Sequence, residues 1–241
     1  MKYYLVAGAS SGIGRETAKQ LSDNDTTVIL VSRRKSTLEG VQKELTGDSI
    51  VVPCDLTVPE QIEHLFKVLS DKQIKLDGMV YCAGICFTKA LKVMDGDDLE
   101  NMFRINVFGF YEMCRHFQKV KVSNKGAAIV GISSYAAITR ETGMSAYAMT
   151  KEAMNVQVQV LAKEFIKRKI RINTVMPGYV MSKMNGEDNV WTEEEIAWAE
   201  QKQPFGLIPI ESVVKVIRFL ISEDADYITG EAIAMNGGYH G

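Results

Sequence analysis

Short apolar runs alternate with longer amphipathic stretches along the whole chain. Most of the runs are rich in β-branched residues and end at Gly, Asp or Ser, which is typical of strands. The stretches between them carry apolar residues at helical spacing. This alternation predicts βαβ units stacked around a parallel sheet. Strands are predicted at residues 3–7, 27–32, 49–54, 78–83, 127–133, 171–176 and 231–236, and helices at 12–21, 36–46, 59–72, 97–119, 147–167 and 210–222.

The length of 241 residues fits a single α/β domain, and no linker interrupts the pattern, so residues 1–241 are predicted to form one domain. One stretch departs from the alternation. Residues 182–209 carry few signals of a strand or a helix core, but they contain both tryptophans of the chain and an acidic run at 193–195. We expect a substrate lid with a short helix here, although a merely decorative excursion would leave the same pattern.

Composition and charge narrow the class of partner. Hydrophobic residues make up 46% and charged residues 24%, as in ordinary globular proteins, and the formal net charge is −2. No basic run exceeds Arg33-Arg34-Lys35, which excludes the charge pattern of a nucleic-acid or membrane surface and favours small-molecule partners. The first residues resemble neither a signal peptide nor a membrane anchor, so a cytoplasmic protein is expected. The four cysteines lack zinc-like spacing, which predicts free thiols and no metal site.

A glycine-rich turn joins the first predicted strand to the first helix, with the sequence Gly8-Ala9-Ser10-Ser11-Gly12-Ile13-Gly14. Gly8 would permit the tight turn, Gly12 would let a pyrophosphate approach the backbone, and Gly14 would let the helix pack closely on the strand. The free N–H groups of the helix would then face the anion. Loops also collect glycine for purely geometric reasons, but the position after the first strand favours a dinucleotide site.

The second predicted strand ends in Ser32-Arg33-Arg34, where an NAD-binding protein usually carries an acid. A carboxylate there would repel a 2′-phosphate, whereas a guanidinium pairs with it in a charge-assisted, bidentate way. Arg33 is the residue we expect to take this role, which predicts a preference for NADP(H) over NAD(H). A solvated arginine pair that opens the next helix is the alternative.

Tyr147 and Lys151 lie four residues apart at the start of an amphipathic stretch, so both side chains should share one helix face. At about 4 Å and an effective dielectric near 20, the ammonium would stabilise a phenolate by about 4 kcal/mol, which would bring the tyrosine pKa to about 7. The spacing alone proves little, because Tyr179 and Lys183 share it. That second pair follows Pro177-Gly178, where no helix is expected to align it.

Further motifs accompany the first pair. Gly8-x-x-x-Gly12-x-Gly14, Asn106, Ser134, Tyr147-x-x-x-Lys151 and Pro177-Gly178 occur in the order and spacing of the short-chain dehydrogenase/reductase family, and the resemblance covers essentially the whole chain. It implies a doubly wound Rossmann fold, with a seven-stranded parallel sheet in the order 3-2-1-4-5-6-7 and helices on both faces. It also implies hydride transfer between a nicotinamide and a carbonyl or secondary alcohol.

By the same resemblance, Tyr147 is the general acid in reduction, Ser134 polarises the substrate oxygen, and Lys151 tunes Tyr147 and binds the nicotinamide ribose. Asn106 would anchor a water that relays protons to Lys151. Ser133 is excluded as the serine by its distance from Tyr147 in the sequence. The residues expected at the cofactor are Gly8, Ser10, Ser11, Gly12, Ile13, Gly14, Ser32, Arg33, Arg34, Asp55, Leu56, Ala83, Gly84, Tyr147, Lys151, Pro177, Gly178, Val180 and Ser182.

The sequence departs from the family pattern at Ala7, where Thr is usual, and at Tyr81-Cys82, where the family carries Asn-Asn. Two supporting hydrogen-bond groups are therefore absent, which puts cofactor affinity in doubt more than activity. Asp55 matches the adenine-binding acid of the family, although a turn-forming aspartate is the alternative. Ser182, where Thr is usual, keeps the hydroxyl.

The substrate is left open by the sequence. The expected pocket residues have few charges, which favours an uncharged carbonyl: Cys86, Phe87, Tyr135, Ala136, Glu141, Tyr179, Met184 and Trp191. Lys125 and Arg168 match basic residues that similar 3-oxoacyl-carrier-protein reductases use for an acidic carrier, although solvated surface residues are commoner. A 3-oxoacyl reductase, a sugar, polyol or hydroxysteroid dehydrogenase, and a non-catalytic NADP-binding sensor remain as alternatives. The resemblance also predicts a homo-oligomer, a tetramer or a dimer.

Overall fold

The computed structural model describes residues 1–181 and 191–239. Its seven parallel strands form one sheet in the order β3-β2-β1-β4-β5-β6-β7, which confirms the predicted order. The strands are β1 (Lys2–Ala7), β2 (Thr26–Ser32), β3 (Asp48–Pro53), β4 (Leu76–Tyr81), β5 (Ser123–Ile132), β6 (Arg171–Pro177) and β7 (Ala232–Met235).

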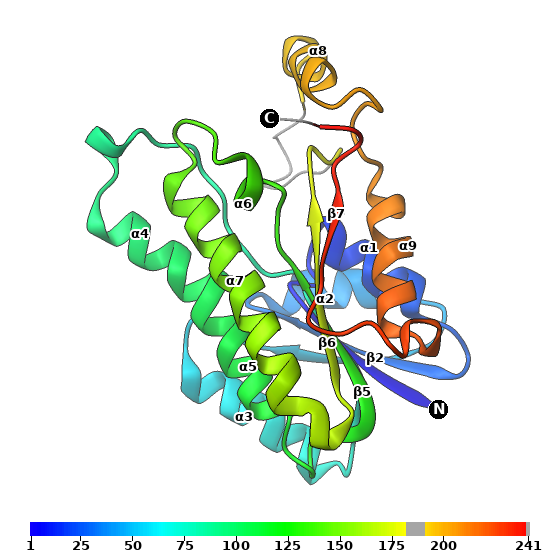
Figure 1. Ribbon diagram of the computed structural model, residues 1–241. Helices are drawn as coiled ribbons and strands as arrows, with labels where there is room; N and C mark the ends of the chain where they lie inside the picture. Colours follow the sequence, from blue (N-terminus) through cyan, green and yellow to red (C-terminus); the bar gives the residue numbers. More distant parts are fainter. Residues whose placement is uncertain (182–190, 240–241) are drawn as a thin grey trace.

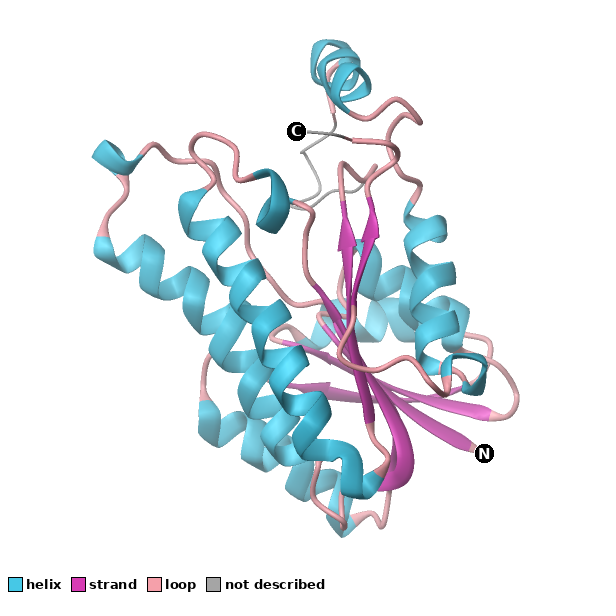
Figure 2. Cartoon of the chain, in the orientation of Figure 1, coloured by secondary structure: helices cyan, strands magenta, loops and turns pink. Residues whose placement is uncertain are grey.

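Helices cover both faces of this sheet (Figure 1 and Figure 2). One face carries α3 (Pro59–Asp71), α5 (Gly109–Phe117) and α7 (Ser145–Glu164), and α4 (Gly96–Phe103) leads into α5. The other face carries α1 (Gly12–Leu21), α2 (Lys35–Gln42) and α9 (Ile210–Ile221). Within the described ranges, no helix combines the length and apolar character that a bilayer span requires.

The strands are buried on both faces, so their side chains feed two apolar cores in alternation. Leu5, Ile29 and Met79 point into the core beneath α3, α5 and α7. Their neighbours Val6, Leu30 and Val80 point into the core beneath α1, α2 and α9. All six are fully buried, which explains why the strands read as continuous apolar runs rather than as alternating ones.

The helix predicted at residues 97–119 is divided. Its backbone follows α4 to Phe103, widens into a π-helical segment at Arg104–Phe108, and continues as α5. Beside this segment, the hydroxyl of Tyr81 donates a hydrogen bond to the carbonyl of Ile105 at 2.6 Å. A π segment is common at functional sites, and this one carries Asn106. Hydrophobic spacing could not reveal the extra residue in the turn.

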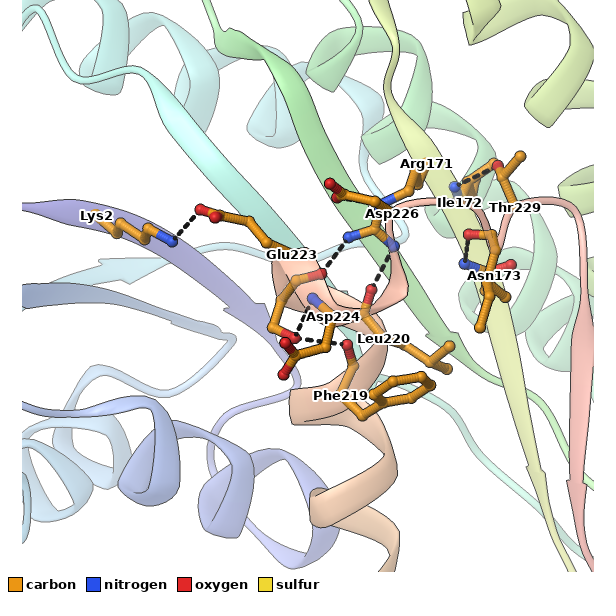
Figure 3. A network of polar contacts seen from close by, with 12 residues as sticks. Lys2, Arg171, Ile172, Asn173, Phe219, Leu220, Glu223, Asp224, Asp226 and Thr229 are labelled. Atoms are coloured by element: carbon orange, nitrogen blue, oxygen red, sulfur yellow. Dashed lines mark hydrogen bonds and ion pairs between the residues drawn. The ribbon is translucent and has the colours of Figure 1, made fainter.

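A buried arginine ties the amino end of β6 to the end of α9 (Figure 3). The guanidinium of Arg171 donates to the carbonyls of Leu220 and Ser222, at 2.7 and 2.6 Å. Next to it, Asn173 donates to the carbonyl of Ile228 at 2.9 Å, and Lys2 of β1 pairs with Glu223 at 3.0 Å. These contacts stabilise the end of the sheet where the strands begin, opposite their carboxyl ends.

At the other end of the sheet, two short helices flank the carboxyl ends of the strands. One of them, α6 (Ala136–Thr139), follows β5 and was not predicted from the sequence. The other, α8 (Glu193–Lys202), is the short helix expected in the predicted lid, and a capping box between Thr192 and Glu195 closes its amino end. The rest of the predicted lid, residues 182–190, lies outside the described residues.

Candidate active site

A cavity of about 1480 Å³ opens at the carboxyl ends of the strands and is lined by residues from the glycine-rich turn to α8. A pocket for one drug-sized ligand usually measures roughly 300–1,000 Å³. This cavity therefore has room for a dinucleotide and a substrate together. Every residue expected at the cofactor lines it except Ser182, which lies outside the described residues.

Glycine is required at the three positions of the turn for different geometric reasons. Gly8 has a φ of +83°, and a Cβ there would lie 2.6 Å from the backbone nitrogen of Ala83. A Cβ on Gly14 would collide with the carbonyl oxygen of Gly8. Gly12 has a φ of +52°, and nothing lies within 4 Å of the position of its absent Cβ. Gly8 and Gly14 thus let the chain pack tightly, while Gly12 leaves an open backbone face toward the cavity, as predicted.

The amino end of α1 fits an anion. Ser11 occupies the N-cap position, but its side chain makes no capping hydrogen bond, and the first turn has no acidic residue. Both Ser10 and Ser11 line the cavity. Free N–H groups and the positive end of the helix dipole therefore face the cavity, which is the arrangement a pyrophosphate needs.

The end of β2 fits a second phosphate. The hydroxyl of Ser32 is buried and has no hydrogen-bond partner among the described residues, although it lies in the cavity wall. Arg33 and Arg34 line the same wall and are exposed. Neither guanidinium lies within ion-pair distance of a carboxylate in the part of the chain that the structure describes. An unsatisfied hydroxyl and two cations thus lie together on the wall where Arg33 was expected to meet a 2′-phosphate.

The residues of the predicted catalytic group converge on the other end of the cavity. Tyr147 and Lys151 lie on one face of α7, with the lysine Nζ 5.6 Å from the centre of the phenol ring. Both are buried, at 5% and 2% exposed. The lysine Nζ also donates to the carbonyl of Ile132 at the end of β5, at 2.7 Å. Ser134 follows that strand and lines the cavity beside Tyr147.

The protonation of this pair differs from the sequence prediction. Burial raises the pKa of the Tyr147 phenol above its ordinary range, and a hydrogen bond with Ser134 lowers it only in part. Burial also lowers the pKa of Lys151 to about 8, against the opposing influence of the Cys86 and Cys82 thiols. The expected tyrosine pKa of about 7 was wrong for this structure, because that reasoning included the attraction of the charges but not the cost of burying them.

Asn106 supports the group from behind and does not line the cavity. It is fully buried, accepts a hydrogen bond from the N–H of Ile85 at 2.9 Å, and donates to the Ile85 carbonyl and the Thr150 hydroxyl, each at 3.0 Å. A Cβ on Gly84 would lie 3.1 Å from the amide oxygen of Asn106 and 3.4 Å from Lys151 Nζ. Gly84 thus makes room for these two side chains, a reason that the sequence did not reveal.

Two doubtful positions are resolved by their contacts. Ser133 also lines the cavity, but it is buried and its hydroxyl donates to the carbonyl of Lys151 at 3.0 Å, so this hydroxyl supports α7. The carboxylate of Asp55 accepts from the N–H and the hydroxyl of Thr57, at 2.9 and 2.7 Å. That contact is the turn-forming role we gave as the alternative, although Asp55 also lines the cavity.

The substrate side of the cavity is more charged than the sequence suggested. Cys86, Tyr135, Ala136, Glu141, Tyr179 and Trp191 line it as expected, Phe87 is not part of the wall, and Met184 lies outside the described residues. Arg140, Glu195 and Lys202 line it too, together with Trp198 and Tyr239. Glu195, Trp198 and Lys202 lie in the predicted lid, and Arg140 adjoins the predicted pocket residue Glu141. Tyr239 could not be identified from the sequence, because the carboxyl terminus reaches the cavity only through the tertiary fold.

The basic pair Lys125 and Arg168 lies elsewhere, at the amino end of β5. Arg168 donates to the hydroxyl and carbonyl of Ser123, at 3.1 and 2.6 Å, and to the carbonyl of Gln118. The guanidinium of Arg168 therefore anchors the loop before β5 and is bonded to the protein rather than only to solvent. This contact is no evidence for carrier binding. Lys125 is exposed at this same end.

Comparisons with known proteins agree with this architecture. A family model described as "Enoyl-(Acyl carrier protein) reductase" matches residues 8–240. The 3-oxoacyl-[acyl-carrier-protein] reductase FabG of Rickettsia conorii is 31% identical over 239 residues, which cover 98% of this chain and 96% of that protein. Carbonyl reductase family member 4 of Xenopus laevis is 29% identical over 240 residues, with 98% and 97% covered.

Solved structures give the same result. A short-chain type dehydrogenase/reductase from Mycobacterium ulcerans superposes with a TM-score of 0.91 at 27% identity and covers 98% of this chain and 89% of that one. A short-chain dehydrogenase/reductase from Serratia marcescens, at 24% identity and a TM-score of 0.89, shares the fold. The chain therefore belongs to the short-chain dehydrogenase/reductase family and is a dehydrogenase/reductase that acts on CH–OH groups.

Proposed function

We propose that this protein is an NADP(H)-dependent reductase that interconverts a carbonyl and a secondary alcohol. One observation carries the proposal: the cavity that holds the two anion sites at α1 and β2 also holds Ser134, Tyr147 and Lys151 at its other end. A dinucleotide bound across the first end would place its reactive ring beside the second. Proximity of the cofactor, the proton donor and the carbonyl is what this chemistry requires.

In the proposed reaction, a bound nicotinamide supplies or accepts the hydride. Tyr147 donates the proton to the carbonyl oxygen, and the raised pKa of its phenol keeps that proton in place at neutral pH. Ser134 donates a hydrogen bond to the same oxygen and so polarises the carbonyl. Lys151, held by the Ile132 carbonyl, places a positive charge beside the phenolate that forms.

Asn106 has a positioning role in this scheme. Its amide holds the backbone of Ile85 and the hydroxyl of Thr150, which precedes Lys151 on α7. It therefore fixes the loop after β4 against the helix that carries the tyrosine and the lysine. The water relay that the family resemblance implies is part of the proposal.

The cofactor would be held by the glycine-rich turn, by Ser32, Arg33 and Arg34, by Asp55 and Leu56, and by Pro177, Gly178 and Val180 after β6. We expect Arg33→Asp to reverse the cofactor preference, because a carboxylate repels the 2′-phosphate that the guanidinium would bind. The ratio of kcat/KM for NADPH over NADH should fall by at least about 100-fold, as expected when a charge-assisted bond is replaced by repulsion.

Lys35→Asp provides the matched control, because Lys35 carries the neighbouring charge but pairs with Glu39 at 3.5 Å and does not line the cavity. That variant should keep the ratio within about threefold, since exposed charges act weakly. An unchanged ratio in Arg33→Asp would show that the arginine is only solvated.

A panel of ketones tests the activity itself. Loss of NADPH absorbance should be seen with at least one of a 3-oxoacyl thioester, a cyclic ketone and a keto sugar. Tyr147→Phe should reduce kcat on that ketone by at least about 100-fold, because general acid catalysis typically contributes 10²–10⁴. Tyr227→Phe, at a fully exposed tyrosine, is the control and should leave kcat unchanged. Cofactor binding without turnover of any ketone would favour the NADP-binding sensor instead.

The relatives support more than one substrate. Their names include a 3-oxoacyl reductase and a carbonyl reductase, and the family description names an enoyl reductase. A 3-oxoacyl reductase is therefore one candidate within the proposed function. The charged residues on the substrate side of the cavity favour a second candidate, a small polar ketone such as a sugar or polyol derivative.

A further inference from the structure

Four polar side chains meet on the substrate side of the cavity. We call Glu141, Tyr179, Tyr239 and Lys202 the Glu141 cluster. All four line the same cavity as Ser134 and Tyr147. They come from the loop after α6, from the residues after β6, from the carboxyl terminus and from the end of α8. The proposed chemistry assigns no role to any of them.

The carboxylate of Glu141 is the centre of the cluster. It accepts a hydrogen bond from the hydroxyl of Tyr239 at 2.6 Å, and its two oxygens lie 3.2 and 3.0 Å from the hydroxyl of Tyr179. A carboxylate offers about four acceptor positions, and the three contacts from the two phenols occupy at most three of them. The side chain is 28% exposed, so it can still accept from a group in the cavity.

The two phenols keep their protons and donate them to Glu141 in hydrogen bonds. Burial, together with the neighbouring carboxylate, raises the pKa of Tyr179 above its ordinary range and that of Tyr239 to about 12. Both therefore remain hydrogen-bond donors at neutral pH. Because both phenols donate to it, the carboxylate is held in one orientation, which is what selective recognition requires.

Aromatic rings and an ammonium group complete the surroundings. The ring of Tyr179 packs edge-on against Trp198, Trp191 and Tyr239, with centroids 5.2, 6.1 and 6.0 Å apart. The ammonium of Lys202 lies 5.9 Å from the centroids of both Trp198 and Tyr239. The cluster thus accommodates a cationic donor group supplied by the protein itself.

That ammonium is held loosely. Its nitrogen lies 3.9 Å from the nearest oxygen of Glu141, beyond hydrogen-bond distance, and its side chain is 44% exposed. A substrate group with a hydrogen to donate could approach the carboxylate more closely than Lys202 does. The lysine can move away because its side chain is flexible.

Glu141 is also fixed relative to the reacting atoms. It lies in the loop that joins Ser134 to α7, and the N–H of Lys89 donates to the carbonyl of Gly143 in that loop at 3.0 Å. A hydrocarbon tail placed here would bury the carboxylate without a donor to replace water, which is unfavourable. The site is thus poorly suited to a plain acyl chain.

We propose that Glu141 determines substrate specificity by accepting hydrogen bonds from a hydroxyl or ammonium group on the part of the substrate remote from the reacting carbonyl. This inference rests on the proposed reductase function and specifies the class of ketone that it acts on. Polyhydroxylated ketones and amino ketones share the required chemistry, because both present donors to a carboxylate.

The test uses four 2-ketones of equal chain length whose far ends carry a methyl, a hydroxyl, a dimethylammonium or a carboxylate group. Wild type should reduce the hydroxyl or the dimethylammonium ketone with a kcat/KM at least about tenfold above that of the methyl ketone, as a charge-assisted hydrogen bond implies. Preference for the first of these two indicates a polyol substrate, and preference for the second indicates an amine.

Glu141→Gln keeps the size of the side chain and an acceptor for the phenols, but it removes the charge. The tenfold preference should fall to about threefold or less, because kcat/KM falls for the hydroxyl and dimethylammonium ketones and stays the same or rises for the methyl ketone, since an amide costs less to bury than a carboxylate. Glu195→Gln is the matched control, because Glu195 also lines the cavity and glutamine preserves its capping box. The preference should survive in that variant.

Lys202→Met removes the internal competitor, so kcat/KM for the dimethylammonium ketone should rise. Equal losses on all four ketones in Glu141→Gln would show that the residue only supports the fold and would overturn the inference. Preference for the carboxylate ketone that disappears in Lys202→Met would overturn it in favour of an anion site. Turnover of none of the ketones would instead refute the reductase function itself.

Discussion

At the scale of single residues, Lys151 combines two demands that oppose each other. Its ammonium is almost completely buried on α7, and its single hydrogen bond in the described structure goes to the Ile132 carbonyl. Burial lowers its pKa from 10.5 to about 8, which means that keeping it charged at neutral pH costs about 3 kcal/mol. The proposed reaction needs that charge beside Tyr147, so we expect function to be obtained here at the expense of stability.

We therefore expect Lys151→Met to raise the melting temperature at pH 7 while it abolishes turnover. The variant gains about 3 kcal/mol of stability because no charge is buried, and it loses about 1 kcal/mol with the hydrogen bond to Ile132. The remaining gain raises the melting temperature by a few degrees. The folded pKa lies below the unfolded one, so the penalty is complete below pH 8 and fades as the pH rises from about 8 to 10.5. The stability gap should close over that range in thermal melts.

Lys163→Met on the same helix is the comparison variant, because Lys163 is exposed and should change stability by less than about 0.5 kcal/mol. A Lys151→Met protein that is less stable than wild type at pH 7, by an amount that does not change up to pH 10, would contradict the argument. The lysine would then be a structural residue.

The placement of side chains could be predicted from the sequence where partners are close in the chain. Tyr147 and Lys151 share a helix face, and Ser134 lines the same cavity, as the family resemblance implied. Tyr239 lies 98 residues from Glu141, and no local pattern joins the two. The prediction of the Tyr147 pKa was wrong for another reason, because a four-residue spacing does not reveal how deeply the side chain is buried.

At the scale of elements, the boundaries that depend on periodicity were predictable and those that depend on packing were not. The glycine-rich turn and α1 lie where predicted, because apolar spacing and glycine placement are local signals. The π segment at Arg104–Phe108 arises where the helix passes the Tyr81 hydroxyl and places the Asn106 side chain against Ile85. Those contacts are tertiary, so apolar spacing predicted one continuous helix.

The carboxyl end of α8 gives an element-scale prediction. Gln203 follows this helix and is fully buried; its amide accepts from the N–H of Tyr179 at 3.0 Å and donates to the Tyr179 carbonyl at 3.2 Å. Gln203→Ala should free this end of the helix, which carries Trp198 and Lys202 into the cavity. We expect KM for the ketone to rise at least about fivefold, since each lost bond weakens positioning by about 1 kcal/mol.

The phosphate sites at α1 and β2 should be unaffected, so Kd for NADPH, measured by fluorescence titration, should change less than about threefold. Thr192→Ala at the other end of α8 removes only an exposed cap, worth about 1 kcal/mol of helix stability, and serves as the comparison. A larger effect from Thr192→Ala than from Gln203→Ala would place the anchor of the helix at its amino end.

At the scale of the whole molecule, the alternation of elements predicted a parallel sheet of seven strands, and the family resemblance implied their order. Parallel strands joined by right-handed crossovers have few ways to stack, and two apolar cores of comparable size require helices on both faces. The alternation could not predict the oligomeric state. A helix that packs on a sheet and a helix that packs on a partner subunit have the same apolar residues in the sequence.

The structure shows which apolar side chains of these helices the sheet leaves uncovered. On α7, Met149, Val156 and Val160 face away from the sheet and are 49%, 50% and 49% exposed. Beside them, Phe108 and Tyr111 are 55% and 47% exposed at the start of α5. A group of large apolar side chains that spans two adjacent helices is typical of a protein interface. We therefore predict a homo-oligomer, a dimer or a tetramer, that buries this surface of α5 and α7.

Light scattering coupled to gel filtration should give a mass of at least two chains for wild type, and Val156→Glu combined with Val160→Glu should give the mass of one chain. The paired change places two charges in the predicted interface, where each would be desolvated without a partner. Val120→Glu combined with Phe219→Glu, at exposed apolar residues outside this surface, should leave the oligomer intact. Because α7 also carries Tyr147 and Lys151, dissociation should lower kcat as well. A monomeric wild type would contradict the prediction and show that the exposed apolar residues of α5 and α7 form no interface between copies of the chain.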